Sequence, residues 1–234
     1  MLPGLEGICY HKRLDKLGLF SLECQRLRGD LTEEMATNGT DARPLFGGSF
    51  SIVLPPHFTD VSDIRDVPDN QEVFVHNSTD QSIIIELLEY QSQVADEEAA
   101  RYHFDDVTTI NDASGKEGTE ILSIEPVGRD QLAMQELSSA WFLSGRQQVA
   151  KFNEQAKNTV NVHLALFRLP QYTTDILITF NDPTSISPFS SSSRQADLAL
   201  LEDLSASPAA QCWTLEQFRA TVNSLRLLSP DIFS

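Results

Sequence analysis

The segment VNVHLALFRLPQYTTDILITF, residues 160–180, gives the strongest indication of the fold. Two strand-type runs, 160–169 and 175–180, flank a short segment that begins with Pro170. Runs of this composition favour strands, and proline presets the backbone angle that the second position of a β-turn requires. The segment therefore predicts two strands that pair antiparallel.

Other strand-type runs surround this hairpin. Phe50, Ile52 and Leu54 alternate with polar neighbours until two prolines end the run. Residues 72–76 and 82–88 are separated by five polar residues, which suits a second hairpin, and the unbroken apolar residues 83–85 indicate a strand that is covered on both faces. Further strands are expected at 120–126 and 140–149.

Two helices are predicted. Thr214-Leu215-Glu216-Gln217 forms a capping box, and the helix that follows presents one apolar stripe before Ser229-Pro230 ends it. The stripe consists of Leu215, Phe218, Val222, Leu225 and Leu228. Residues 95–107 have acidic residues in the first turn, as a helix dipole prefers. Antiparallel strands with helices before and after, and no repeated βαβ unit, predict an α+β fold in which helices sandwich an antiparallel sheet.

Segments outside this pattern define the domain boundaries. Residues 1–36 combine leucines at helical steps with basic residues, which fits an amphipathic targeting helix, but three glycines that each cost about 1 kcal/mol relative to alanine favour an appendage without fixed structure. This stretch also resembles the tail of retrotransposon reverse transcriptases. We therefore expect a leader and linker over 1–43, a domain over 44–234, and a mobile Ser/Pro-rich loop at 182–210.

The chain is strongly acidic, with a formal net charge of −17. Residues 37–234 contain twelve Lys and Arg against twenty-eight Asp and Glu, so this part alone has a net charge of −16. Such a surface repels nucleic-acid phosphates and anionic lipid headgroups, so nucleic acid is not an expected partner. Solubility and a preference for a basic partner surface explain the charge equally well.

Cys9, Cys24 and Cys212 have neither metal-ligand spacing nor the even count of a disulfide framework, which is typical of a reducing compartment. No apolar run approaches the roughly 20 residues of a membrane span, and the N-terminus lacks the order of a signal peptide. We therefore expect a protein of the nucleus and cytoplasm, without direct membrane insertion.

The common catalytic and cofactor motifs are absent from the sequence. It contains no GxxxxGK[ST], no GxGxxG after a strand, no HExxH, no GxSxG and no CxxC. The five histidines fall in separate segments, and none forms the i,i+4 pair of a zinc-binding helix. We therefore expect no catalytic residue, no cofactor and no metal.

Carboxylates are densest around the second predicted hairpin. Asp60, Asp63, Asp66, Asp69 and Glu72 recur at every third residue. A solvated turn in which aspartates cap short helices explains this spacing. A carboxylate-dependent hydrolase is a remote alternative, because the spacing does not set the ~5–9 Å separation that glycoside hydrolysis needs.

Longer motifs relate the chain to a known family. PLFGGSF at 44–50, DVSDIR at 60–65 and VPDNQEVF at 67–74 resemble the opening of the Ran guanine nucleotide release factors, the Mog-one family. The similarity continues through DQSIIIELLE at 80–89, ARYHF at 100–104, WFLSGRQQ at 141–148 and LFRLPQYTTD at 166–175. It covers residues 44–234 and leaves out 1–36.

This resemblance implies a fold shared with the PsbP photosystem proteins, an antiparallel sheet sandwiched by helices. It implies a partner, the basic small GTPase Ran, whose guanine nucleotide release the protein promotes in support of nucleocytoplasmic transport. It also implies a role in surface trafficking of a voltage-gated sodium channel through a cytoplasmic channel loop, with plasma-membrane localisation through such partners. We expect a monomer. An adaptor that binds Ran or a channel loop without accelerating exchange is the alternative.

The resemblance also assigns the Ran-binding residues: Glu86, Glu89, Asp63, Asp69, Asn70 and Glu72. Glu86 and Glu89 would be the acidic pair. Residues three apart on a regular strand point to opposite faces, so these two share a surface only if the strand bends or ends near Leu88.

Overall fold

The computed structural model describes residues 42–111, 113, 118–150, 157–185 and 212–234. The predicted leader up to residue 41 and most of the predicted Ser/Pro-rich loop, 186–211, lie outside these described residues. The first four residues of that predicted loop, 182–185, belong to a strand.

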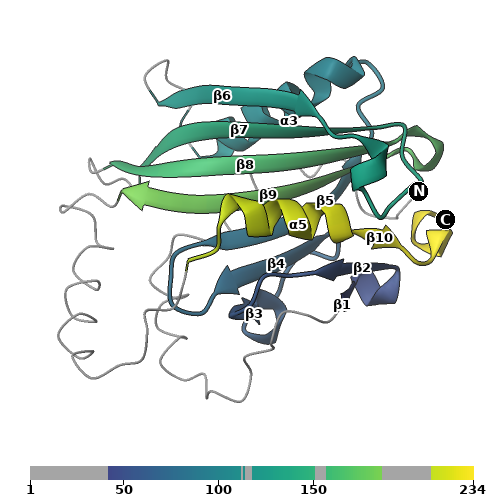
Figure 1. Cartoon of the computed structure of the whole chain (residues 1–234), viewed down its shortest axis with the longest axis horizontal. Helices are drawn as coiled ribbons and strands as arrows, with labels where there is room; N and C mark the ends of the chain where they lie inside the picture. The colour runs from purple at the N-terminus through teal and green to yellow at the C-terminus, as the bar shows by residue number, and fades with distance from the viewer. Residues whose placement is uncertain (1–41, 112, 114–117, 151–156, 186–211) are drawn as a thin grey trace.

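Seven antiparallel strands form the central sheet, in the order β3-β4-β5-β9-β8-β7-β6 (Figure 1). They are β3 (Phe58–Asp60), β4 (Gln71–His76), β5 (Ser82–Glu89), β6 (Thr119–Pro126), β7 (Ser139–Ala150), β8 (Lys157–Leu169) and β9 (Thr174–Ser185). The predicted hairpin is confirmed: β8 and β9 pair antiparallel through the 3-10 turn η6 (Pro170–Tyr172). Thr173 closes this turn in the left-handed conformation, with φ 48°.

A small second sheet lies beside the central one. It has the order β1-β2-β10, with β1 (Ala42–Leu45), β2 (Phe50–Val53) and β10 (Arg226–Leu227). The 3-10 turn η3 (Phe46–Gly48) joins β1 to β2, with φ of 66° at Gly47 and 90° at Gly48. Glycine is the residue that adopts such angles without steric cost, which explains the double glycine in this turn.

The helices α3 (Asp96–Ile110) and α5 (Leu215–Ser224) lie on opposite sides of the central sheet (Figure 1). The capping box of α5 is confirmed, because the Thr214 hydroxyl accepts a hydrogen bond from the Gln217 N–H (3.1 Å) and the Gln217 side chain accepts one from the Thr214 N–H (2.8 Å). None of the helices among the described residues is long and apolar enough to cross a membrane.

The predicted extent of the last helix is wrong at its C-terminal end. Helix α5 ends at Ser224, and the chain becomes extended at Leu225, with ψ 132°. Residues 226–227 then pair with β2 as strand β10. Leu228, the last member of the predicted stripe, is consequently 59% exposed.

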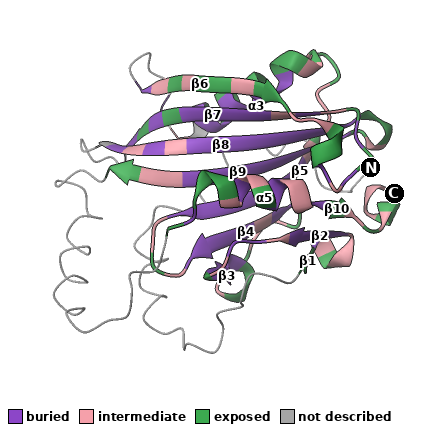
Figure 2. Ribbon diagram, viewed as in Figure 1, coloured by how far each residue is buried: buried purple, intermediate pink, exposed green. Residues whose placement is uncertain are grey.

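Apolar clusters cover both faces of the central sheet. Phe50 of β2, Ile85 of β5 and Phe218 of α5 belong to the larger cluster, which we call the α5-side core. Phe104 of α3 and Leu164 of β8 belong to the cluster on the α3 side. Figure 2 shows β5, β8 and β9 buried over most of their described length, whereas the edge strand β6 is largely exposed. The expected α+β fold is confirmed.

Candidate partner-binding face

The register of β5 decides which carboxylates share a face of the sheet. Glu72 of β4 lies directly opposite Ile85, and β5 pairs with both neighbours without a bulge. Paired residues point to the same face, and residues along a strand alternate between faces. Because Ile85 points into the α5-side core, Glu72 and Glu89 lie on that face, and Glu86 lies on the other. Positions 85 and 89 are about 13 Å apart along the strand.

Glu86 and Asn70 are buried, with exposures of 1% and 8%. The Gln71 Nε2 donates a hydrogen bond to Glu86 Oε1 (2.5 Å). The Asn70 side chain donates to the Leu87 carbonyl (3.1 Å), and the Leu87 N–H donates to the Asn70 carbonyl (2.9 Å). These contacts hold the start of β4 and the residue before it against β5. Both side chains are buried in this fold, so we expect them to support the binding face rather than to contact a partner directly.

Glu72 is half-buried where β4 meets the η3 turn. The Phe46 N–H donates a hydrogen bond to Glu72 Oε1 at 2.5 Å. Burial raises the pKa of Glu72 and the charge of Asp60 raises it further, whereas the Phe46 N–H and Arg43 act in the opposite direction. The carboxylate is thus fixed in position and only partly compensated, so a cation from a partner would stabilise its charged form.

Asp60 has a structural role in the same region. Its carboxylate forms an ion pair with Arg43 and accepts hydrogen bonds from the Ser62 N–H (2.9 Å) and hydroxyl (2.6 Å). It thereby caps the 3-10 helix η4 (Val61–Asp63), so the capping interpretation is confirmed at this residue. The carboxylates of Asp63 and Asp69, also expected to bind Ran, are exposed on the β3–β4 connection.

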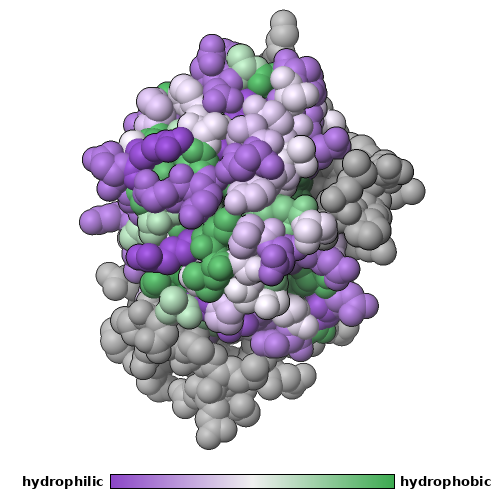
Figure 3. Space-filling view, turned by 90° about the vertical axis from the view of Figure 1, so that its right-hand side faces the viewer, coloured by the Kyte–Doolittle hydropathy of each residue, from purple (hydrophilic) through white to green (hydrophobic). Residues whose placement is uncertain are grey.

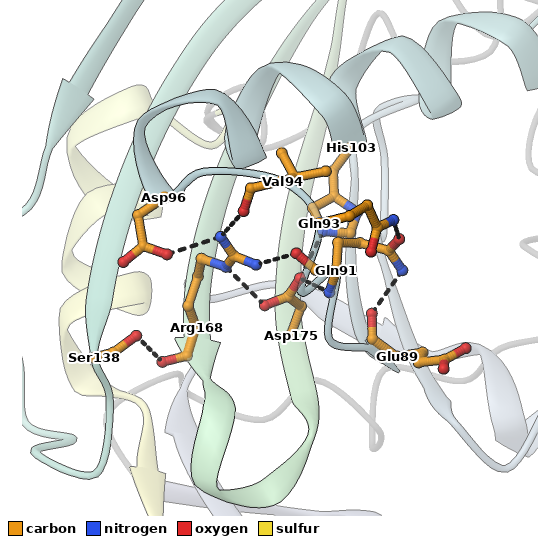
Figure 4. A network of polar contacts seen from close by, with 9 residues as sticks. All are labelled: Glu89, Gln91, Gln93, Val94, Asp96, His103, Ser138, Arg168 and Asp175. Atoms are coloured by element: carbon orange, nitrogen blue, oxygen red, sulfur yellow. Dashed lines mark hydrogen bonds and ion pairs between the residues drawn. The ribbon is translucent and has the colours of Figure 1, made fainter.

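Glu89 is the exposed last residue of β5, and the segment after it folds around a buried arginine (Figure 4). Arg168 of β8 has 0% exposure. Its guanidinium donates to Asp175 Oδ1 (3.2 Å), the Gln91 carbonyl (2.7 Å), the Val94 carbonyl (2.8 Å) and Asp96 Oδ1 (2.8 Å). It also lies over the Tyr90 ring, 4.3 Å from the centroid. Arg168 therefore contacts the connection between β5 and α3 at Tyr90, Gln91 and Val94, and the first residue of α3.

Asp175 completes this network from strand β9. Its Oδ2 accepts from the Gln91 N–H (3.2 Å) and lies 3.1 Å from His103 Nε2 (Figure 4). The Gln91 side chain in turn donates to the Glu89 carbonyl (2.9 Å). The backbone that presents Glu89 is thus tied to a buried ion pair. Arg168 and Asp175 lie in the family motif LFRLPQYTTD, but no structural role was expected for either. A charged residue within the apolar run ALFRL indicates that Arg168 is buried and paired.

Fold and surface together define an α+β domain with two carboxylates on one face of its sheet, Glu72 held by a backbone N–H and Glu89 exposed at the end of β5. Within the part of the chain that the structure describes, no group of three or more His, Cys, Asp or Glu could hold a metal ion. The arrangement suits recognition of a cationic surface.

Comparison with known proteins places the chain in a family of proteins that interact with Ran. The profile of the Ran-interacting Mog1 protein family matches residues 43–183. The Ran guanine nucleotide release factor of Danio rerio is 56% identical over 192 residues, covering 82% of this chain and 99% of the relative. The factor of that name from Homo sapiens is 48% identical over 196 residues, covering 81% and 95%. The chain belongs to this family.

A solved structure is also similar. The crystal structure of the Ran-binding protein Mog1p from Saccharomyces cerevisiae superposes with a TM-score of 0.58 at 26% identity, covering 83% of this chain and 98% of the yeast chain. The similarity therefore extends over the described domain and agrees with the family assignment.

Proposed function

We propose that this chain binds the small GTPase Ran and promotes release of its guanine nucleotide in support of nuclear transport. The names of its relatives state Ran binding and nucleotide release for those proteins. The single structural observation that supports the proposal is the placement of Glu72 and Glu89 on one face of the sheet, with the Glu72 carboxylate held by the Phe46 N–H and the Glu89 side chain exposed. On a chain with a net charge of −17, such a face attracts a basic GTPase and orients it.

The proposed mechanism needs no covalent or proton-transfer step. A GTPase retains its nucleotide through Mg²⁺ and a P-loop lysine. A carboxylate that competes for this lysine, or that repels the phosphates, weakens nucleotide binding and stabilises the empty GTPase. The exposed Glu89 is suited to this competition, and the fixed Glu72 is suited to docking. A hydrolase is disfavoured, because the carboxylate beside Glu72, Asp60, is buried against Arg43.

Stopped-flow release of a fluorescent guanine nucleotide from Ran tests this function. We expect the chain to accelerate release, with a rate that rises with its concentration and saturates. Binding without acceleration would overturn release activity and establish the adaptor alternative.

The sodium-channel role and plasma-membrane localisation through partners stay predictions from the resemblance. A cytoplasmic channel-loop peptide that competes with Ran for this chain would support them. Presence in the nucleus and cytoplasm fits the proposed function and is checked by imaging the full chain in cells.

The raised pKa of Glu72 predicts a pH dependence of binding. A partner cation stabilises the charged carboxylate, so affinity for Ran falls as the pH drops from 7 through the raised pKa of free Glu72, which lies above its ordinary 4.5. The effect on folding stability has the opposite sign. Because the pKa of Glu72 is raised in the folded state, this group increases the free energy of unfolding as the pH falls. Titrations of Ran between pH 7 and 5 should show a shallower decline for Glu72→Gln than for the unmodified chain. Equal declines would contradict the assignment of Glu72.

A further inference from the structure

A row of four aromatic rings joins the η3 turn, which binds Glu72, to the η6 turn at the start of β9. Phe46, whose N–H binds Glu72, packs edge-on against Phe50, with ring centroids 5.8 Å apart. Phe50 packs edge-on against Phe233 at 6.0 Å, and Phe233 stacks on Tyr172 at 4.5 Å with an interplanar angle of 13°. The row therefore begins at the backbone that fixes Glu72.

Its other end, Tyr172, lies two residues before Thr174, the pairing partner of Glu89. Tyr172 lies in the η6 turn, and the next residue, Thr173, accepts a hydrogen bond at its carbonyl from the Tyr90 N–H (3.0 Å). Thr174 pairs directly with Glu89 in the sheet. The aromatic row thus connects the turn whose backbone binds Glu72 with the turn that precedes the pairing partner of Glu89, across three segments that are distant in sequence.

Three of the four rings are partly open to solvent. Phe50 is 1% exposed, whereas Phe46, Tyr172 and Phe233 are half-buried at the rim of the α5-side core, as is Ile232. Figure 3 shows the end of the molecule where the C-terminus lies, with apolar side chains gathered among polar ones. Protein interfaces commonly have such an arrangement, with aromatic residues at the centre and charged residues at the rim.

We infer that Phe46, Tyr172 and Phe233 form the apolar centre of the surface that binds the GTPase, with Glu72 and Glu89 as its charged rim. This inference rests on the proposed function and adds the chemistry of the contact. The occupant is a basic protein segment in which an apolar side chain lies between cationic ones. Continuity with the two carboxylates and charge complementarity both favour this occupant. Arginine side chains can contact the ring faces as well as the carboxylates.

The test measures affinity for Ran at low and high salt. Phe233→Ala should weaken binding about tenfold at both salt concentrations, because a buried aromatic anchor acts without screening. The loss caused by Glu72→Gln should shrink at high salt. Phe233→Leu, which keeps an apolar side chain, should recover part of the affinity. The matched control is Leu122→Ala, an exposed leucine on edge strand β6 (48% exposed), which should bind like the unmodified chain.

Thermal unfolding of each variant shows whether the fold is retained. Tyr172→Ser removes a second ring of the aromatic row. Unchanged affinity of folded Phe233→Ala and Tyr172→Ser, while Glu72→Gln loses affinity, would overturn the aromatic centre and leave the proposed function standing. An equal loss in Leu122→Ala would also overturn it. Failure of the unmodified chain to bind Ran would overturn both.

Discussion

Arg168→Met should lower the free energy of unfolding by about 3–5 kcal/mol, because it leaves the Asp175 carboxylate buried without its cation. The substitution also removes the donors to the Gln91 and Val94 carbonyls, which hold the connection between β5 and α3. Urea unfolding followed by circular dichroism measures the loss. Arg168→Lys should recover only part of it, since an ammonium cannot reproduce the geometry of the guanidinium contacts.

The matched control for this prediction is Arg101→Met. Arg101 forms an exposed ion pair with Glu98 at 3.4 Å, within one helix turn. Such pairs contribute little, so the change should stay below about 0.5 kcal/mol. A similar loss in both variants, or a stable Arg168→Met protein, would show that the buried network does not organise this region.

Gly145→Ala should destabilise the fold by roughly 1–3 kcal/mol through overpacking. A Cβ atom built at Gly145 would lie 2.4 Å from Cζ of Phe104 and 3.0 Å from the Glu120 carbonyl oxygen. Phe104 is fully buried in α3, so its ring cannot simply turn away. Thermal and urea unfolding should both report the loss.

Two further variants make this prediction specific. Gln148→Ala is on the same strand but exposed, and it should leave stability nearly unchanged. Phe104→Leu should lower the free energy of unfolding less in the Gly145→Ala variant than in the unmodified chain, because the smaller side chain leaves space for the added methyl group. Purely additive losses would contradict the steric explanation.

Most of the central sheet could be predicted because its strands are long. The strands of the 160–180 hairpin have ten or more residues each, so composition and turn chemistry agree over a wide window. The two-sided burial expected for residues 83–85 is confirmed, since Ile83 and Ile85 belong to one apolar cluster and Ile84 to another.

Three short strands were not predicted from local patterns, although alternation did indicate the four-residue β2. β1, β3 and β10 have between two and four residues, which leaves little length in which a period can be recognised. Their pairing depends on partners distant in sequence, as when Arg226–Leu227 pairs with β2. The same tertiary pairing ended α5 before Leu228, although the apolar stripe continued.

The proposed site stays a prediction, and only part of it could be inferred from the sequence. Sequence motifs indicated Glu72 and Glu89 among the binding residues, but only the register of β4 and β5 shows that these two share a face. Alternation along β5 indicated that Glu86 and Glu89 point to opposite faces of the sheet. The structure agrees, since β5 has no bulge and Glu86 is buried on the face opposite Glu89. The aromatic row was not foreseen, because its rings come from η3, η6 and the C-terminal turn η7 (Pro230–Phe233).

The most direct test compares the affinity of Ran for three isosteric variants, Glu72→Gln, Glu89→Gln and Glu86→Gln, in one titration series. Each removes one charge and preserves shape, and Glu86→Gln keeps an oxygen to accept the hydrogen bond from Gln71. We expect roughly tenfold weaker binding for Glu72→Gln and Glu89→Gln, and unchanged binding for Glu86→Gln. Loss of affinity in a folded Glu86→Gln protein, with normal binding by the other two, would contradict the shared face of Glu72 and Glu89 as the binding surface.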